Sequence, residues 1–166
     1  MDIPIRMLDN QDAEHFQQLR LTGLKTMPEA FGSSFEEEVD LAMNEIRRRL
    51  DDRPNAVFGA FTDGELIGVA GFAGNTKVKQ RHKGILWGVY VDPKWRGHQL
   101  GKRLTQAVID HARLHVDTLH ATVMASNDSA RTRYLKLGFT IFRIDHDALR
   151  IDGKTYVDEL LRLDLR

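Results

Sequence analysis

The sequence predicts a mixed α/β fold, with one sheet that is antiparallel in its early strands, parallel where a helix connects neighbours, and covered by helices on both faces. Three observations support this. Short apolar runs alternate with stretches of helical periodicity, and the early runs are joined by a tight turn while the later ones are separated by helical segments. The length of 166 residues suits a single domain over residues 1–166, with 42% hydrophobic content.

The N-terminal third is predicted to contain one strand and two helices. Residues 3–8 alternate as a strand does. A helix follows from a capping aspartate at Asp12, and Pro28 stops it. A second helix begins at a capping serine, Ser33 or Ser34, and its apolar positions keep helical spacing as far as residue 50. Its other face is charged.

The middle of the chain is predicted to form three strands. Residues 56–61 and 66–73 make a hairpin around a Thr-Asp-Gly turn at 62–64. A polar loop over 75–83 leads into an apolar run, residues 86–91, which Pro93 ends. The hairpin and this third strand are therefore expected to lie together in the sheet.

The C-terminal half alternates helices and strands. A helix from the basic turn at 93–97 continues to about residue 111, and a strand follows over 119–125. A short helix capped at residues 127–129 ends at Gly138. Residues 139–144 and 156–163 complete the sheet.

The strand, turn and helix between residues 86 and 112 form the most informative stretch. The first N–H groups of a helix lack partners and carry partial positive charge, which favours an anion. Gly97 and Gly101 allow main chain to approach a ligand closely, while Arg96, Lys102 and Arg103 add positive charge. This turn is therefore suited to a pyrophosphate. The alternative is an ordinary solvated basic turn.

Two nucleotide-binding motifs do not match this turn. The Walker-type phosphate loop needs four residues between its glycines and Ser or Thr after its Lys, whereas three residues separate Gly97 from Gly101 and Arg103 follows Lys102. The dinucleotide fingerprint needs three glycines, and only two are present.

The turn resembles the coenzyme-binding motif of the GCN5-related N-acetyltransferases, the GNAT superfamily. In that motif a central strand is followed by Arg or Gln, two residues, Gly, one residue, and Gly or Ala. These positions are Arg96, Gln99 and Gly101 here, and Gln99 departs from the usual glycine. The order of elements from residue 3 to 163 also resembles the family's.

A second signature of the same family, Asn-x-x-Ala-x-x-x-Tyr-x-x-x-Gly-Phe, matches at every position. Its residues are Asn127, Ala130, Tyr134, Gly138 and Phe139. The resemblance implies that Asn127 bonds the pantetheine arm and that Tyr134 sits at the sulfur as a catalytic residue. The alternative makes Asn127 a simple helix cap and Tyr134 a core aromatic residue.

By resemblance, the fold is a GNAT-like mixed, mostly antiparallel sheet whose central parallel strands splay apart, and acetyl-CoA is the cosubstrate. Pantetheine would bond the free strand backbone, and the pyrophosphate would cap the turn. The coenzyme-binding residues so implied are Val89, Tyr90, Val91, Arg96, Gly97, His98, Gln99, Leu100, Gly101, Lys102, Asn127, Ala130 and Tyr134. No metal site is predicted.

Acetyl transfer to an amine needs the neutral amine. Reaching it at pH 7 costs about 4.6 kcal/mol for a lysine-like amine and about 1 kcal/mol for an α-amine. Relatives place a glutamate on the coenzyme strand or a histidine on the next strand. Here the coenzyme strand, residues 86–91, has no carboxylate, and Thr122 occupies the position of that histidine. No general base is assigned, and the candidates are Glu36, Glu37, Glu38, His82 and His120. Trp87 and Tyr90 are expected on opposite faces of their strand.

Composition limits the partners. The chain has 24 Lys and Arg residues and 24 Asp and Glu residues, so its net charge gives no reason to expect binding to nucleic acid or to an acidic membrane surface. No cysteine is present, so neither a disulfide nor a thiol nucleophile is available, and the N-terminus is too polar for a signal peptide. We expect a cytoplasmic protein.

The expected function is direct acetyl transfer to a primary amine on a small molecule or peptide, and the resemblance allows a homodimer. Two rival functions stay open: a non-catalytic acyl-CoA sensor, or an acyltransferase with a different acyl group or an oxygen acceptor.

Overall fold

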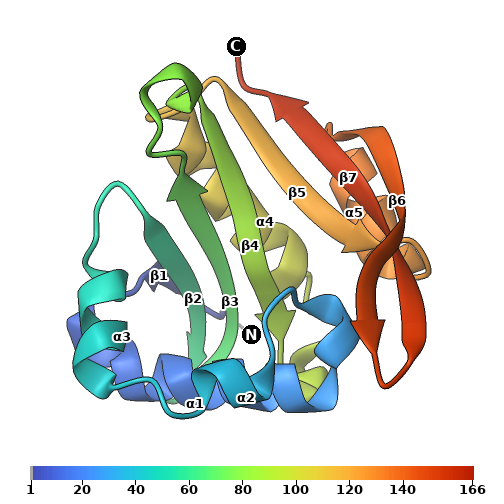
Figure 1. Ribbon diagram of the computed structural model, residues 1–166. Coiled ribbons are helices and arrows are strands. Elements are labelled where there is room, and N and C mark those ends of the chain that lie inside the picture. Colours follow the sequence, from blue (N-terminus) through green and yellow to red (C-terminus); the bar gives the residue numbers. More distant parts are fainter. Residues whose placement is uncertain (1) are drawn as a thin grey trace.

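The computed structural model describes residues 2–166, whose strands form one seven-stranded sheet in the order β1-β2-β3-β4-β5-β7-β6 (Figure 1). Neighbouring strands are antiparallel except for β4 and β5, which are parallel. This is the mixed, mostly antiparallel sheet that the sequence predicts. The strands are β1 (Ile5–Met7), β2 (Ala56–Thr62), β3 (Glu65–Gly74), β4 (Lys83–Val91), β5 (Thr118–Met124), β6 (Thr140–Ile151) and β7 (Lys154–Asp164).

Helices cover both faces of the sheet (Figure 1). The helices α1 and α3 pack on one face around Leu19, Ile46 and Val69, whereas α4 and α5 pack on the other around Leu104, Val108 and Tyr134. The α-helices are α1 (Ala13–Thr26), α2 (Phe35–Glu38), α3 (Met43–Leu50), α4 (Leu100–Arg113) and α5 (Asp128–Lys136). Short 3-10 turns include Asn10–Asp12 and Pro28–Ala30.

The second helix that the sequence predicts is broken into two, α2 and α3. Ser34 caps α2 with the expected capping box, but Ala42 is extended, with φ −63° and ψ 138°. The carbonyl of Glu38 accepts from Gln17 Nε2 (2.9 Å) and from the Leu41 amide (3.2 Å), so the chain turns here. The helical spacing of apolar residues continues across this break, because the spacing carries no information on such tertiary hydrogen bonds. The sequence therefore predicts one helix where the structure has two.

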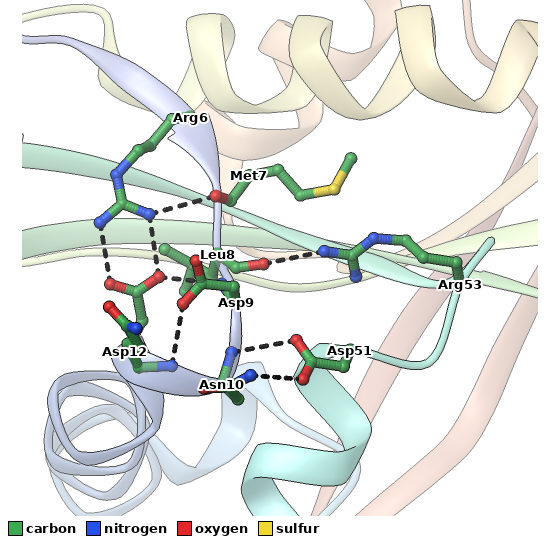
Figure 2. Close-up of polar contacts among 9 residues, drawn as sticks. Arg6, Met7, Leu8, Asp9, Asn10, Asp12, Asp51 and Arg53 are labelled. Carbon is green, nitrogen blue, oxygen red and sulfur yellow. Dashed lines mark hydrogen bonds and ion pairs between the residues drawn. The ribbon is translucent and has the colours of Figure 1, made fainter.

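The start of α1 is held by a polar network (Figure 2). Arg6 makes two 2.8 Å hydrogen bonds to the nearly buried carboxylate of Asp12, which lowers the pKa of that carboxyl group. Asn10 bonds Asp51 at the end of α3 through both its backbone and its side chain. The layer formed by α1 and α3 is thereby fixed to the edge of the sheet.

The β6–β7 hairpin is longer than the sequence predicts. Its strands extend to Ile151 and from Lys154, around a turn in which Asp152 and Gly153 have φ of 50° and 79°. This Asp-Gly turn is a strong hairpin signal. None of the added residues is buried, and the polar run Asp145, His146, Asp147 interrupts the alternation of apolar and polar side chains, so strand periodicity does not carry the prediction past residue 144.

The parallel strands β4 and β5 splay apart, as expected. They pair only over Lys83 to Ile85 on β4, opposite Thr118 to His120 on β5. Beyond Ile85, the edge of β4 that faces β5 has no strand partner in the described residues, although β4 continues to Val91. A buried backbone group normally needs a partner, so this edge is a place for a ligand that carries amides.

A β-bulge lies in the splayed part of β4. Trp87 is opposite Gly71 and Tyr90 is opposite Val69, so Gly88 and Val89 together face one residue of β3. Gly88 has φ 64°, a conformation that glycine adopts without strain. The bulge shifts the alternation by one residue, and Trp87 and Tyr90 both pack against the α1 layer. The expectation that they face opposite sides was wrong for this reason.

Candidate active site

A cavity of about 690 Å³ lies where β4 leaves β5, between the start of α4 and one face of α5. All but two of the coenzyme-binding residues expected from the sequence line it; the exceptions are His98 and Tyr134. Those that line it are Val89, Tyr90, Val91, Arg96, Gly97, Gln99, Leu100, Gly101, Lys102, Asn127 and Ala130. Two stretches about thirty residues apart in the sequence thus share one cavity.

The first turn of α4 opens into this cavity. Helix α4 starts at Leu100, and the Arg103 amide donates to the Gln99 carbonyl (3.0 Å) as its first helical bond. The amides of Leu100, Gly101 and Lys102 precede that bond and have no partner within the helix. These amides, the helix dipole and the nearby lysine make the turn suitable for an anion.

Gln99, at the usual glycine position, has φ 57° and ψ 22°, the left-handed conformation. This conformation costs a non-glycine residue roughly 1–2 kcal/mol. The backbone conformation therefore explains the family's preference for glycine at this position. The explanation holds even if a side chain here would not meet the phosphates.

Replacing Gln99 with glycine is expected to raise the free energy of unfolding by about 1 kcal/mol, because relief of the left-handed strain exceeds the added freedom of the unfolded chain. Acetyl-CoA affinity should change by less than tenfold, under about 1.4 kcal/mol. Urea unfolding and calorimetry measure the two effects. Asp63→Gly, at a left-handed turn residue (φ 49°) outside both cavities described here, is the matched control. A larger loss of affinity would mean that the Gln99 amide is a ligand.

Arg133 is a cavity residue that the sequence analysis missed. Its guanidinium lies against Gly101, where an added Cβ would come within 2.6 Å of Nη1. Its Nε is the only buried side-chain nitrogen or oxygen without a hydrogen-bond partner among residues 2–166. A buried polar group of this kind is costly. Arg133 therefore presents an unsatisfied cationic group beside the first turn of α4.

Tyr134 lies beneath Arg133 and does not itself line the cavity. The Arg133 guanidinium carbon is 5.2 Å from the centre of the tyrosine ring, whose other neighbour is Phe139 at 5.5 Å. Only 5% of Tyr134 is exposed, and this burial raises the pKa of its phenol. Tyr134 is therefore protonated at neutral pH, and its hydroxyl is available as a hydrogen-bond donor.

Asn127 acts as the cap of α5. Its side-chain oxygen accepts from the Ala130 amide at 3.2 Å, and the residue also lines the cavity. The capping role and the coenzyme role are compatible, because the oxygen serves the helix while the amide nitrogen remains available as a donor.

A second cavity, of about 320 Å³, lies on the other side of the bulge. It is lined by the loop after α1, by β4 from Ile85 to Gly88, and by β5 from His120 to Thr122. Ala30 lines both cavities. The two spaces therefore approach each other at Gly88 and Val89.

Comparison with known proteins decides the family. The model of the acetyltransferase (GNAT) family matches residues 24–139, more than half of the chain. The chain belongs to the GNAT family. It is therefore an N-acetyltransferase, and acetyl-CoA is its cosubstrate. Among curated proteins no match is found.

Solved acetyltransferase structures share the whole fold at low identity. A GNAT acetyltransferase from Streptococcus pneumoniae superposes with TM-score 0.85 at 20% identity, covering 98% of this chain and 99% of that one. A putative acetyltransferase from Salmonella typhimurium, solved with its cofactor acetyl-CoA, gives 0.83 at 20% identity, covering 100% and 95%. A ribosomal-protein-alanine N-acetyltransferase from Brucella melitensis gives 0.83 at 19%, covering 97% and 99%.

Of the five candidate bases in this GNAT chain, only His120 lines the second cavity. Glu36 and His82 are exposed, and Glu37 completes the capping box with Ser34. Burial alone would raise the pKa of Glu38, but its hydrogen bonds and ion pair with Arg20 outweigh burial and lower that pKa. A carboxylate so stabilised is a poor base.

The pKa of His120 lies below its ordinary value, because burial and the nearby charges of Lys83 and Arg162 disfavour the imidazolium. The imidazole is therefore neutral at pH 7 and able to accept a proton. Its ring also contacts Phe142, with centroids 5.6 Å apart. His120 lies two residues before Thr122 and so on the same face of β5. The strand thus carries a histidine on the face where relatives have one, displaced by two positions.

Residues 2–166 contain neither a membrane-spanning helix nor a metal-ion cluster. No helix is long and apolar enough to span a bilayer. No group of three or more His, Cys, Asp or Glu side chains in this range is arranged to hold a metal ion.

Proposed function

We propose that residues 1–166 form a single catalytic domain that transfers the acetyl group of acetyl-CoA directly to a primary amine. The observation that carries this proposal is the pair of cavities that approach each other at the β4 bulge. One has the anion-binding turn and the free strand edge that a coenzyme requires, while the other has a neutral histidine. The chain has no cysteine to carry the acetyl group as a thioester intermediate, which favours direct attack.

In this mechanism the pyrophosphate binds the amides of the first turn of α4 together with Arg133, and pantetheine bonds the free edge of β4. The amide of Val89 would donate to the thioester oxygen as negative charge develops. The amine nitrogen forms its bond to the carbonyl carbon as the carbon–sulfur bond breaks. His120 takes the amine proton, directly or through water, and Tyr134 donates a hydrogen bond to the departing sulfur.

His120→Gln is expected to lower kcat/KM at pH 7 by about tenfold, because water in the cavity can replace part of the lost base. Below the lowered pKa of His120, two protonations, of the amine and of the imidazole, should each reduce the parental rate. The logarithm of kcat/KM then falls with a slope of two in the parent and of one in the variant. A pH–rate series measures the slopes.

The control is His15→Gln, at an exposed position of α1 that lines neither cavity, and it should keep both rate and slope. A His120→Gln enzyme with the parental profile would place the base elsewhere.

The proposal is tested by following free thiol release from acetyl-CoA with a panel of amines. Tight acetyl-CoA binding without turnover on any amine would favour the sensor alternative. Rates of thiol release with a series of acyl-CoA chain lengths, and with alcohol acceptors, test the second alternative, an acyltransferase that uses a different acyl group or an oxygen acceptor. The cytoplasmic location and the homodimer stay predictions.

A further inference from the structure

Arg20 is an arginine on the apolar face of α1, where only 8% of it is exposed. Its Nε and Nη2 donate to the two carboxylate oxygens of Glu38, both at 3.0 Å. Its guanidinium lies over the rings of Phe31 and Trp87, at 5.0 and 5.4 Å. The position of this cation is therefore fixed on three sides by an ion pair and two aromatic rings.

The remaining nitrogen of Arg20, Nη1, is directed toward the bulge of β4. A Cβ added to Gly88 would lie 3.2 Å from Nη1. In the described part of the chain Nη1 makes no hydrogen bond, and it is not sealed from solvent, since Arg133 Nε is the only buried unpartnered atom there. Arg20 lines the second cavity. Two N–H donors on a fixed cation thus face the cavity.

The charge of this cavity excludes one class of acceptor. Over the residues that the structure describes, its lining contains no carboxylate, and Arg20 is its one permanent charge. Glu38 is bound to Arg20, and His120 is neutral at pH 7. A polyamine or another polycation would find no anionic partner here and would face a buried arginine. An acceptor with an anionic group would satisfy that arginine.

We propose that the acceptor is an amino acid, a primary amine whose carboxylate accepts hydrogen bonds from Nη1 of Arg20. The inference rests on the proposed function and names the substrate class of the same site. Gly88, beside Nη1, directly precedes Val89, where the thioester carbonyl is expected, and consecutive Cα atoms are only about 3.8 Å apart. A carboxylate held by Arg20 therefore places a nearby amine next to the acyl carbon.

The test compares each free amino acid with its carboxamide and with the amine that lacks the carboxyl group. The parent should prefer the carboxylate form by at least tenfold in kcat/KM, mainly through KM. In the double variant Arg20→Gln, Glu38→Gln, which keeps the ion-pair site neutral and hydrogen-bonded, this preference should vanish. The ratio of the kcat/KM values of two substrates, measured on one variant, does not depend on the fraction of protein that is folded. Acetyl-CoA affinity, measured by calorimetry, reports the fold independently.

Arg131→Gln is the matched control, since Arg131 forms a similar pair with the buried Glu159 (2.8 Å) and lines neither cavity. It should retain the parental preference. Equal use of acid, amide and simple amine by the parent, or a preference for polyamines or phosphorylated amines, would overturn the amino-acid assignment while leaving acetyl transfer intact. A preference that survives in the double variant would overturn the role of Arg20. Turnover with no amine at all would instead contradict the proposed function.

Discussion

Gly101→Glu is expected to lower acetyl-CoA affinity by at least a hundredfold, about 2.7 kcal/mol. The new carboxylate would sit in the first turn of α4, where the pyrophosphate is expected, and would repel it. It would also neutralise Arg133, whose guanidinium already touches this position. The fold should not suffer, because a glutamate in the first turn favours the helix and Arg133 is a flexible side chain that can shift. Calorimetry measures the affinity, and thermal unfolding measures the stability.

Gly74→Glu is the control for this change. Gly74 lies at the end of β3, lines neither cavity, and has nothing within 4 Å of an added Cβ. A glutamate there should leave affinity unchanged. If Gly101→Glu binds acetyl-CoA as tightly as the parent, the pyrophosphate does not lie on α4.

Tyr134→Phe should lower kcat by about a hundredfold, the lower range for loss of a general acid, while acetyl-CoA affinity changes by less than threefold. Burial raises the pKa of Tyr134, so the phenol keeps its proton at pH 7 and above. Full transfer of that proton to a cysteine-like thiolate is uphill by more than about 2 kcal/mol, so a hydrogen bond to the sulfur is the expected contribution. Single-turnover kinetics on a validated amine measure the chemical step.

Tyr156→Phe tests whether the effect is specific. Tyr156 lies on β7 beside Lys154, in neither cavity, and its loss of a hydroxyl should leave kcat unchanged. A Tyr134→Phe enzyme at the parental rate would leave Tyr134 as a packing residue under Arg133.

Features encoded by neighbouring residues were predicted well from the sequence. The caps at Ser34 and Asn127, the hairpin turn at residues 62–64, and the glycine that ends α5 are local. The strand, turn and helix over residues 86–112 are local too, which is why most of the expected coenzyme residues line one cavity.

Features that depend on tertiary contacts were missed. The break between α2 and α3 depends on Gln17, about twenty residues away. The Arg133 side chain reaches Gly101 from α5, across the cavity that separates α5 from the start of α4, and no local sequence pattern encodes this contact. Two sequence signals were nevertheless present: Gly88 inside an apolar strand marks a bulge, and Arg20 is a charged residue on the apolar face of α1.

The short pairing of β4 with β5 leaves a gap in the hydrogen bonding of the sheet. Strands β1 to β4 form one part of the sheet and β5 to β7 form the other, and in the described residues the β4–β5 ladder between them has three residue pairs. Pantetheine bonded along the open edge of β4 would continue the hydrogen-bonding pattern where protein backbone stops. We therefore expect pantetheine to fill the gap in the sheet between β4 and β5 while acetyl-CoA is bound, and to leave that edge of β4 open again when the product dissociates.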